Sequence, residues 1–106
     1  MKSHVRGTTW NGMHVTYAKL GVPVNLTGFD AVSRFRPLKH GGDIFEFNIT
    51  DGTLFMPSPA NGKIFYKPRI INAEPGLYEF DLKIISPEGL VYVIVQSQIE
   101  ILPNIS

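Results

Sequence analysis

The sequence predicts an all-β fold, an antiparallel sandwich of about seven or eight strands in a single domain. The strongest indication follows Pro75-Gly76, where apolar and charged residues alternate: Tyr78, Phe80, Leu82 and Ile84 with Glu79, Asp81 and Lys83. A period of two gives a strand one buried face and one solvated face. Turn-forming residues recur roughly every 8–12 residues, and no segment has an apolar 3.6-residue period long enough for a helix.

Glycine- and proline-containing turns divide the chain into expected strands at residues 5–10, 14–20, 29–36, 44–49, 53–56, 63–68, 77–85 and 90–102. The pair Asn11-Gly12 favours a tight turn between the first two strands. Pro68 places the strand at 63–68 toward a sheet edge, because proline cannot donate a ladder hydrogen bond. We expect residues 70–73 to form a crossover loop or a single helical turn.

The last two expected strands form a hairpin around residues 86–89, Ser-Pro-Glu-Gly, a sequence typical of a type I turn. A two-residue loop would place Val91 opposite Ile84 and Val93 opposite Leu82, so that core residues meet. A three-residue loop with a bulge at the glycine would shift the pairing by one residue and invert the second strand. We prefer the two-residue loop.

The other face of the last strand supports this preference, because it ends in the polar residues Gln96, Gln98 and Glu100, which belong in water. The same face carries Tyr92 and Ile94 beside the charged residues of the preceding strand. Either a loop or a neighbouring strand covers these two side chains, or they form a protein–protein contact. Tyr92 and Ile94 are therefore the candidate interface residues.

Composition limits the class of protein. The chain has 106 residues, which fit one domain over 1–106, and its hydrophobic fraction of 43% and charged fraction of 18% predict a folded chain. Cysteine is absent, which excludes thiol catalysis, thiolate metal sites and disulfides. The sandwich must therefore be held by its core alone.

The net charge is +1, and the densest basic spot is small. It contains Arg34, Arg36, Lys39 and His40, and Asp43 closes it. Nucleic-acid binding normally needs a longer stripe of clustered lysine and arginine. We expect a solvated strand end here and no nucleic-acid partner.

The N-terminal residues contain no apolar run of the kind found in signal peptides. The longest apolar run, residues 90–95, is far shorter than a membrane span. We expect a soluble protein made in a cytoplasm, with no membrane partner.

No residue pattern indicates catalysis. His4, His14 and His40 are scattered without ligand spacing, and the alternation around Glu79 and Asp81 indicates solvent exposure rather than an acid–base pair. Neither a Gly-x-Ser-x-Gly elbow nor a glycine-rich phosphate loop occurs. We expect a protein that is not an enzyme and uses no cofactor, metal or small-molecule substrate.

Trp10 and Tyr66 are the candidates for stacking on a sugar. A lone tryptophan near the start of a sandwich is more often part of the core or caps it. An adhesion or carbohydrate-binding module would need both rings exposed in a shallow groove, and burial of both would remove that alternative.

Three short motifs occur in a recognisable order. Residues 21–28, Gly-Val-Pro-Val-Asn-Leu-Thr-Gly, resemble the G-x-P-I/V-D/N-L-T-G segment of small phage and prophage proteins. Residues 75–82, Pro-Gly-Leu-Tyr-Glu-Phe-Asp-Leu, are similar to their P-G-x-Y-x-Y/F-D-L element, and a P-D/E-G turn and a terminal strand follow. Residues 6–10, Arg-Gly-Thr-Thr-Trp, resemble their R-G-D-S/T-F/W start, with Thr8 in place of the usual acidic residue.

In their order and spacing these motifs resemble the immunoglobulin-like domain of phage baseplate and tail proteins, including the N-terminal domain of baseplate upper proteins. The resemblance implies an immunoglobulin-like sandwich with a structural or assembly role in a virion, often as a repeated copy. It implies partners among other tail or baseplate proteins, self-association, and assembly in the bacterial host cytoplasm. It supplies no catalytic residues. An immunoglobulin-like adhesion or carbohydrate-binding module is the alternative.

Overall fold

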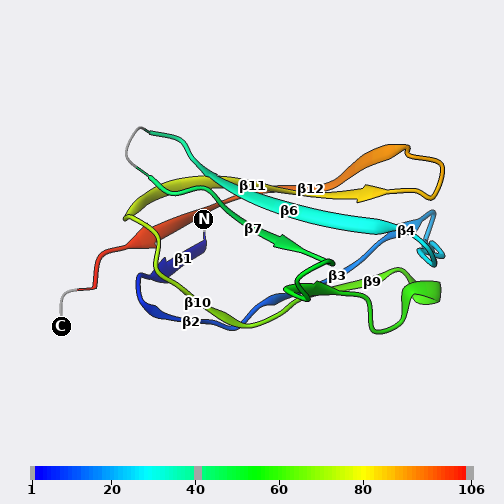
Figure 1. Cartoon of the computed structure of the whole chain (residues 1–106), viewed down its shortest axis with the longest axis horizontal. Coiled ribbons are helices and arrows are strands. Elements are labelled where there is room, and N and C mark those ends of the chain that lie inside the picture. The colour runs from blue at the N-terminus through cyan, green and yellow to red at the C-terminus, as the bar shows by residue number, and fades with distance from the viewer. Residues whose placement is uncertain (1, 40–41, 105–106) are drawn as a thin grey trace.

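The computed structural model describes residues 2–39 and 42–104, which form β-strands and one 3₁₀ helix and contain no α-helix (Figure 1). The elements in chain order are β1 (Lys2–Val5), β2 (Thr8–Trp10), β3 (Met13–Thr16), β4 (Ala18–Lys19), β5 (Val22–Pro23), β6 (Asp30–Pro37), β7 (Phe45–Asn48), β8 (Leu54–Phe55), η1 (Pro59–Asn61), β9 (Lys63–Tyr66), β10 (Arg69–Ile71), β11 (Gly76–Ile85) and β12 (Val91–Leu102). The predicted all-β class is confirmed.

The main layer is a five-stranded sheet in the order β1-β12-β11-β6-β7. All its pairs are antiparallel except β1 with β12, which run parallel. The two longest strands, β11 and β12, lie beside each other in this sheet, and β6 flanks β11 on its other side. Strand length and apolar alternation therefore coincide at the centre of the sheet, where burial is deepest.

Smaller sheets form the opposite layer. The strands β3, β9 and β8 form one sheet, and β2 pairs with β10 in another. Figure 1 shows β2, β10, β3 and β9 along one side of the molecule and β11, β12 and β6 along the other. The remaining pair, β4 with β5, forms a short hairpin at one end, which we call the arm (residues 18–23). The predicted sandwich character is confirmed.

Several predicted elements differ from the structure. The expected strand at 5–10 divides at Gly7, which has a φ of +81°, so that β1 joins the main sheet and β2 the opposite layer. The expected crossover loop or helical turn at 70–73 is wrong, because Arg69–Ile71 is strand β10. The expected edge position of the 63–68 strand is also wrong. β9 ends before Pro68 and is the middle strand of its sheet.

The transition from β2 to β3 is not a hairpin, because these strands belong to different sheets. Gly12 lies at this crossing with a φ of +83°, and a Cβ there would lie only 2.2 Å from the carbonyl oxygen of Tyr66. Both the conformation and the close approach require glycine. Asn11-Gly12 therefore lies where the chain passes from one layer to the other, and not in a turn between two paired strands.

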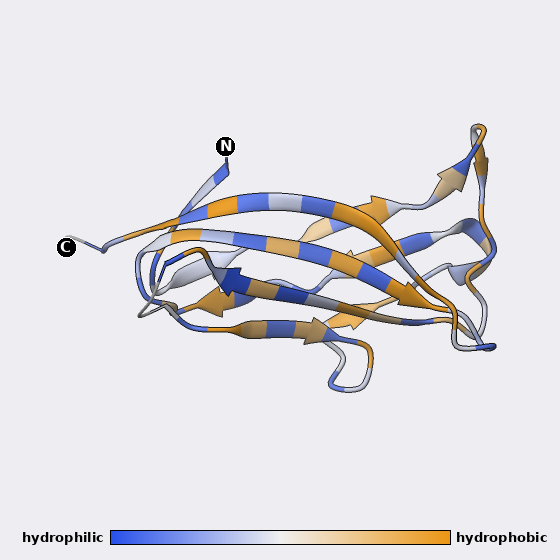
Figure 2. Ribbon diagram, turned by 90° about the horizontal axis from the view of Figure 1, so that it is seen from above, coloured by the Kyte–Doolittle hydropathy of each residue, from blue (hydrophilic) through white to orange (hydrophobic). Residues whose placement is uncertain are grey.

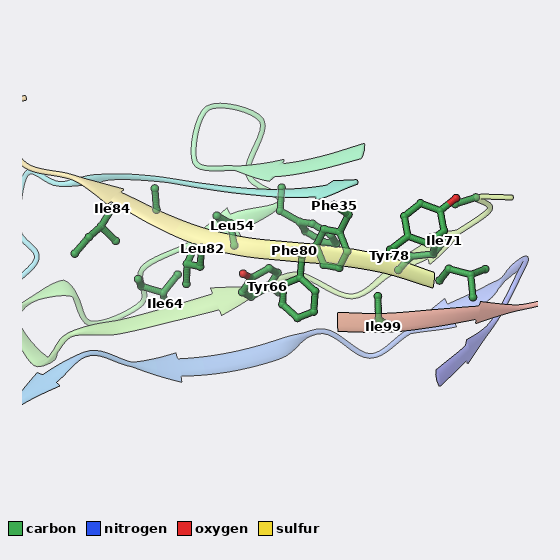
Figure 3. Close-up of a cluster of buried hydrophobic side chains, with 14 of the residues drawn as sticks. Phe35, Leu54, Ile64, Tyr66, Ile71, Tyr78, Phe80, Leu82, Ile84 and Ile99 are labelled. Atoms are coloured by element: carbon green, nitrogen blue, oxygen red, sulfur yellow. The ribbon is translucent and has the colours of Figure 1, made fainter. Parts of the chain in front are cut away.

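Aliphatic side chains and aromatic rings together fill the space between the layers (Figure 3). Phe35 of β6 stacks on Phe80 at 4.4 Å and on Phe45 at 4.7 Å between ring centroids. Trp10 meets Phe47 edge-on at 5.4 Å and Tyr66 at 5.8 Å. Stacked and edge-to-face pairs of this kind stabilise a core beyond the area they bury.

A buried chain of hydrogen bonds crosses the core. The hydroxyl of Tyr66 donates to Ser33 Oγ at 2.7 Å, and Ser33 Oγ donates to the carbonyl of Asp81 at 2.7 Å. These residues come from β9, β6 and β11, so the chain joins the two layers. Burial raises the pKa of the Tyr66 hydroxyl to about 12. The polar groups are satisfied, which is the condition for burying them without a large cost.

The pairing of β11 with β12 differs from the predicted register. Gly89 has a φ of +89°, and Ser86 and Leu90 close a three-residue loop through the Ser86 N–H donating to the Leu90 carbonyl at 2.8 Å. Tyr92 therefore lies opposite Ile84, and Val93 opposite Lys83. The prediction that Val91 and Val93 face the core is wrong.

Farther along β12, a second irregularity returns the predicted core residues to the core side of the sheet. The register shifts between Leu82 and Lys83, and Ile94 is the extra residue on β12, so that Leu82 pairs with Val95. Beyond this bulge Ile99 and Ile101 are buried, as the sequence predicts. A bulge adds one unpaired residue to one strand, so the alternation of side chains between the two faces shifts by one position. This shift cancels the one that the three-residue loop introduced.

This register gives a direct test by two matched substitutions. Val93→Thr on the outer face should change the free energy of unfolding by less than about 0.5 kcal/mol. Val95→Thr should cost about 1 kcal/mol or more, because it places a hydroxyl against the core. Urea denaturation of both variants measures the difference. The reverse ranking would support the two-residue loop and contradict the bulge.

The tyrosine hydrogen bond can be tested through pH. Tyr66→Phe should lower the free energy of unfolding by about 1 kcal/mol at neutral pH, since one buried hydrogen bond is lost. The folded-state pKa of Tyr66, about 12, lies above the ordinary value of 10.0. Wild-type stability should therefore fall between pH 10 and pH 12, as only the unfolded state releases the proton.

The Tyr66→Phe variant lacks this titration but shares the chain's other tyrosines. The stability difference between the two proteins should consequently shrink as the pH rises through this range. Denaturant curves at pH 8 and pH 11 measure it. A difference that stays constant would argue against a buried, titrating Tyr66.

Candidate functional site

Exposed apolar side chains gather at one end of the molecule. Six of the eleven exposed large apolar residues in the described chain belong to the arm or to the β11–β12 turn and the strand after it: Leu20, Val22, Leu90, Val91, Tyr92 and Val93. Figure 1 shows β4 and the closed end of the β11–β12 hairpin at the same end. We call this end of the molecule the hairpin end; Val91 and Val93 lie on the outer face of the main sheet there, and Tyr92 on its core face. Clustered apolar exposure, unlike single exposed residues, typically marks an interaction site.

The two hairpins are in contact. The ammonium of Lys19 on β4 lies 6.0 Å from the centroid of the Tyr92 ring on β12, a cation–π distance. Tyr92 lies on the core face of its strand, opposite Ile84, but at the open end of the sandwich, where it is 40% exposed. The arm therefore borders the apolar end of the main sheet.

The predicted interface pair has two different environments. Tyr92 belongs to the hairpin end. Ile94 is only half-buried and packs against the core at the bulge. The residues placed by the structure on the outer face are instead Val91, opposite Ile85, and Val93, opposite Lys83.

Sequence reasoning missed Leu20 and Val22. Residues 14–20 read as one strand, and leucine is not a residue that signals a turn. Gly21 was the available sign, since a glycine two residues before Pro23 can close a two-residue hairpin. The structure pairs Lys19 with Val22 and leaves Leu20-Gly21 as that turn.

The turn of the arm is strained. Leu20 has a φ of +52° and Gly21 a φ of +79°, the conformation of a type I′ turn. Among the described residues, Leu20 is the only non-glycine residue with positive φ. Its side chain is fully exposed, and in Figure 2 the arm projects from the body with a hydrophobic tip.

A polar depression of about 320 Å³ lies elsewhere, on the outer face of the main sheet. Arg36 pairs with Asp81 at 3.2 Å and approaches Glu79 at 3.9 Å, with Gln96 and Gln98 alongside. The Asp81 side chain is only 12% exposed, so the expectation of a fully solvated face is wrong at this residue. Arg36 covers its carboxylate, and cross-strand packing on a curled sheet limits water access.

Of the two predicted stacking rings, Tyr66 lies in the core and Trp10 packs against it. Tyr66 is buried, and Trp10 is half-buried with its edge contacts to Phe47 and Tyr66. Of the histidines, His14 stacks on Phe65 at 3.8 Å, and His4 lies 2.9 Å from the Thr8 carbonyl. His40 lies outside the described residues.

The basic spot, metal ligation and a membrane span are the remaining features that the sequence raised. Arg34 pairs with Glu46 at 3.1 Å, so two arginines of the basic spot face carboxylates. Within residues 2–39 and 42–104, three or more histidine, aspartate or glutamate side chains nowhere meet as a set of metal ligands. The described part of the chain also has no helix that could span a bilayer.

Comparison of the chain with known proteins adds no assignment for the fold or for the hairpin end. No family model, no curated protein and no solved structure matches this chain. A functional assignment therefore depends on the chain's own residues, and on the motif resemblance described above.

Proposed function

We propose that the chain is a non-enzymatic interaction domain that docks through its hairpin end, as a structural or assembly component of a phage-type tail or baseplate. The observation that carries the proposal is the concentration of exposed apolar side chains on two adjoining hairpins. The proposed partners are other tail or baseplate proteins, and assembly takes place in the bacterial host cytoplasm.

Energetics support docking at this end. Full burial of an exposed valine or leucine side chain contributes about 1.5–3 kcal/mol, and covering a side chain that is already partly buried contributes a corresponding fraction. Val91 and Val93 are 59% and 48% exposed, and both project from the outer face of a sheet that is fixed by the core behind it. A partner that covers them gains this burial without first having to order the surface.

The phage assignment is supported by the motif order in the sequence. One of those motifs lies at the hairpin end, because the segment 21–28 begins in the turn of the arm. The segment 75–82 forms the start of β11, at the end of that strand away from the β11–β12 turn. We further propose that the sandwich is of the immunoglobulin-like type, which the two packed layers and the same resemblance support.

The carbohydrate-binding alternative requires Trp10 and Tyr66 in an open groove. Because the ring of Tyr66 is buried and Trp10 is partly buried against the rings of Phe47 and Tyr66, the two rings do not form the open groove that this function requires. We therefore do not propose that function.

The proposal is tested in particles from the bacterium that carries the gene. After induction, an antibody to the chain should detect it in purified tails or in tail assembly intermediates. The double variant Val91→Asn, Val93→Asn should be incorporated at least about tenfold less, which corresponds to about 1.4 kcal/mol of docking free energy.

The matched control is Ile70→Asn, which removes a similarly exposed apolar side chain from β10, away from the hairpin end. It should be incorporated at the wild-type level. Absence of the wild-type chain from both particles and intermediates would contradict the virion role. Equal incorporation of the double variant would contradict docking through Val91 and Val93.

A further inference from the structure

We infer that the arm docks into an apolar hollow on a second copy of the same chain, so that copies self-associate. This inference rests on the proposed function and names one partner of the hairpin end. It stands on three observations: a strained and fully exposed leucine, an apolar hollow on the surface, and opposite charges on the two surfaces.

The first observation is that Leu20 contributes nothing to the folded monomer. Its side chain is fully exposed. Its φ of +52° is a left-handed conformation that costs an L-residue with a Cβ free energy, and for which asparagine or glycine is preferred in this turn. A residue that breaks the local rule without a compensating contact in the fold points to a functional constraint.

The second observation is the hollow, which we define by its lining residues Leu26, Phe29, Ile49, Leu54, Phe55 and Met56. Its volume is about 320 Å³. Leu26 and Leu54 are fully buried, whereas Phe55 is 40% exposed. An apolar cavity of about 150 Å³ accepts a benzene-sized group, so this hollow has room for the tip of the arm.

The third observation is charge. In the arm and its flanks, residues 17–24, the only charged residue is Lys19. In the two segments that line the hollow, residues 26–29 and 49–59, the only charged residue is Asp51, and Asp30 directly follows the first segment. Hydrogen bonds from Thr53 lower the pKa of the Asp51 carboxyl, which keeps it ionised. Opposite charges at the edges of an apolar contact favour the correct orientation.

The contact is intermolecular. Leu20 does not enter the hollow of its own molecule, because its side chain is fully exposed. If each molecule gives its arm to one neighbour and its hollow to another, the contact is heterologous and forms a ring or a filament, whereas two molecules that exchange arms form a closed two-fold dimer. One arm in one hollow is smaller than a standard interface, so the contact is weak alone and becomes strong in a repeated array.

The test uses the substitution Leu20→Asn. Asparagine is favoured in this turn, so the monomer should fold at least as stably as wild type, with a melting temperature unchanged or raised by a few degrees. Self-association should weaken about tenfold to hundredfold, as expected when a buried leucine is lost. Opposite effects on folding and association separate the docking role from a structural role.

Sedimentation velocity is measured up to about 1 mM chain, where contacts with a Kd near 1 mM are detectable. Wild type should show concentration-dependent growth in mass, and Ile70→Asn, the matched exposed-apolar control, should behave as wild type. A wild-type chain that stays monomeric overturns the inference. Growth of Leu20→Asn equal to wild type, or an equal loss in Ile70→Asn, overturns it as well.

A complementation experiment tests the pairing of surfaces. Phe55→Asp alters the hollow and keeps the arm, while Leu20→Asn alters the arm and keeps the hollow. Each should be monomeric alone, and an equimolar mixture should form a one-to-one dimer that grows no further. A mixture without dimer overturns the assignment of the hollow. Near-UV circular dichroism verifies folding, and Phe55→Ser replaces Phe55→Asp if the latter unfolds.

The outcomes for the two proposals are distinct. A monomeric wild type that is still incorporated into particles through Val91 and Val93 overturns self-docking and leaves the proposed function standing. Association through Leu20, in a chain that is absent from particles and intermediates, supports self-docking and contradicts the proposed function.

Discussion

The pairing of β11 with β12 is the constraint on which both the core and the exposed end depend. A glycine with positive φ closes the turn as a three-residue loop, and this shifts the first residues of β12 by one position. Val91 and Val93 therefore face outward, and only the extra residue at Ile94 returns the rest of the strand to the core face. With a two-residue loop, the same sequence would bury these valines and turn Tyr92 and Ile94 to the outer face in their place.

Behind that hairpin, the core supplies the rigidity that a docking surface needs. The stack of Phe45, Phe35 and Phe80 fills the interior, and the hydrogen bonds from Tyr66 through Ser33 to β11 connect the layers. The opposite layer consists of short strands, so these side chains, more than backbone pairing, hold it to the main sheet. Removing the Tyr66 hydroxyl would weaken that connection while leaving the aromatic packing in place.

Stability and interaction conflict at the arm. A more favourable turn residue than Leu20 would benefit the monomer, and the apolar hollow between residues 26–29 and 49–59 remains uncovered. Both features are explained together if the two surfaces meet in an assembly. The same reasoning applies to the outer valines, whose side chains have no role in the core. At the hairpin end, the residues that would best stabilise the folded monomer therefore differ from those that docking requires.

The sequence by itself determined the class of fold, because a period of two with strong apolar contrast in residues 76–85 leaves no alternative to a half-buried strand. It also placed the core face of Ile99 and Ile101 correctly. Tertiary structure decided the rest. The turn geometry reversed Val91 and Val93, and β10, the partner of β2, was too short to be distinguished from a loop. Trp10 and Tyr66 are packed among rings from other strands, and Leu20 is exposed by a turn that its residue type does not signal. Such outcomes depend on contacts between residues far apart in the chain, which local patterns do not encode.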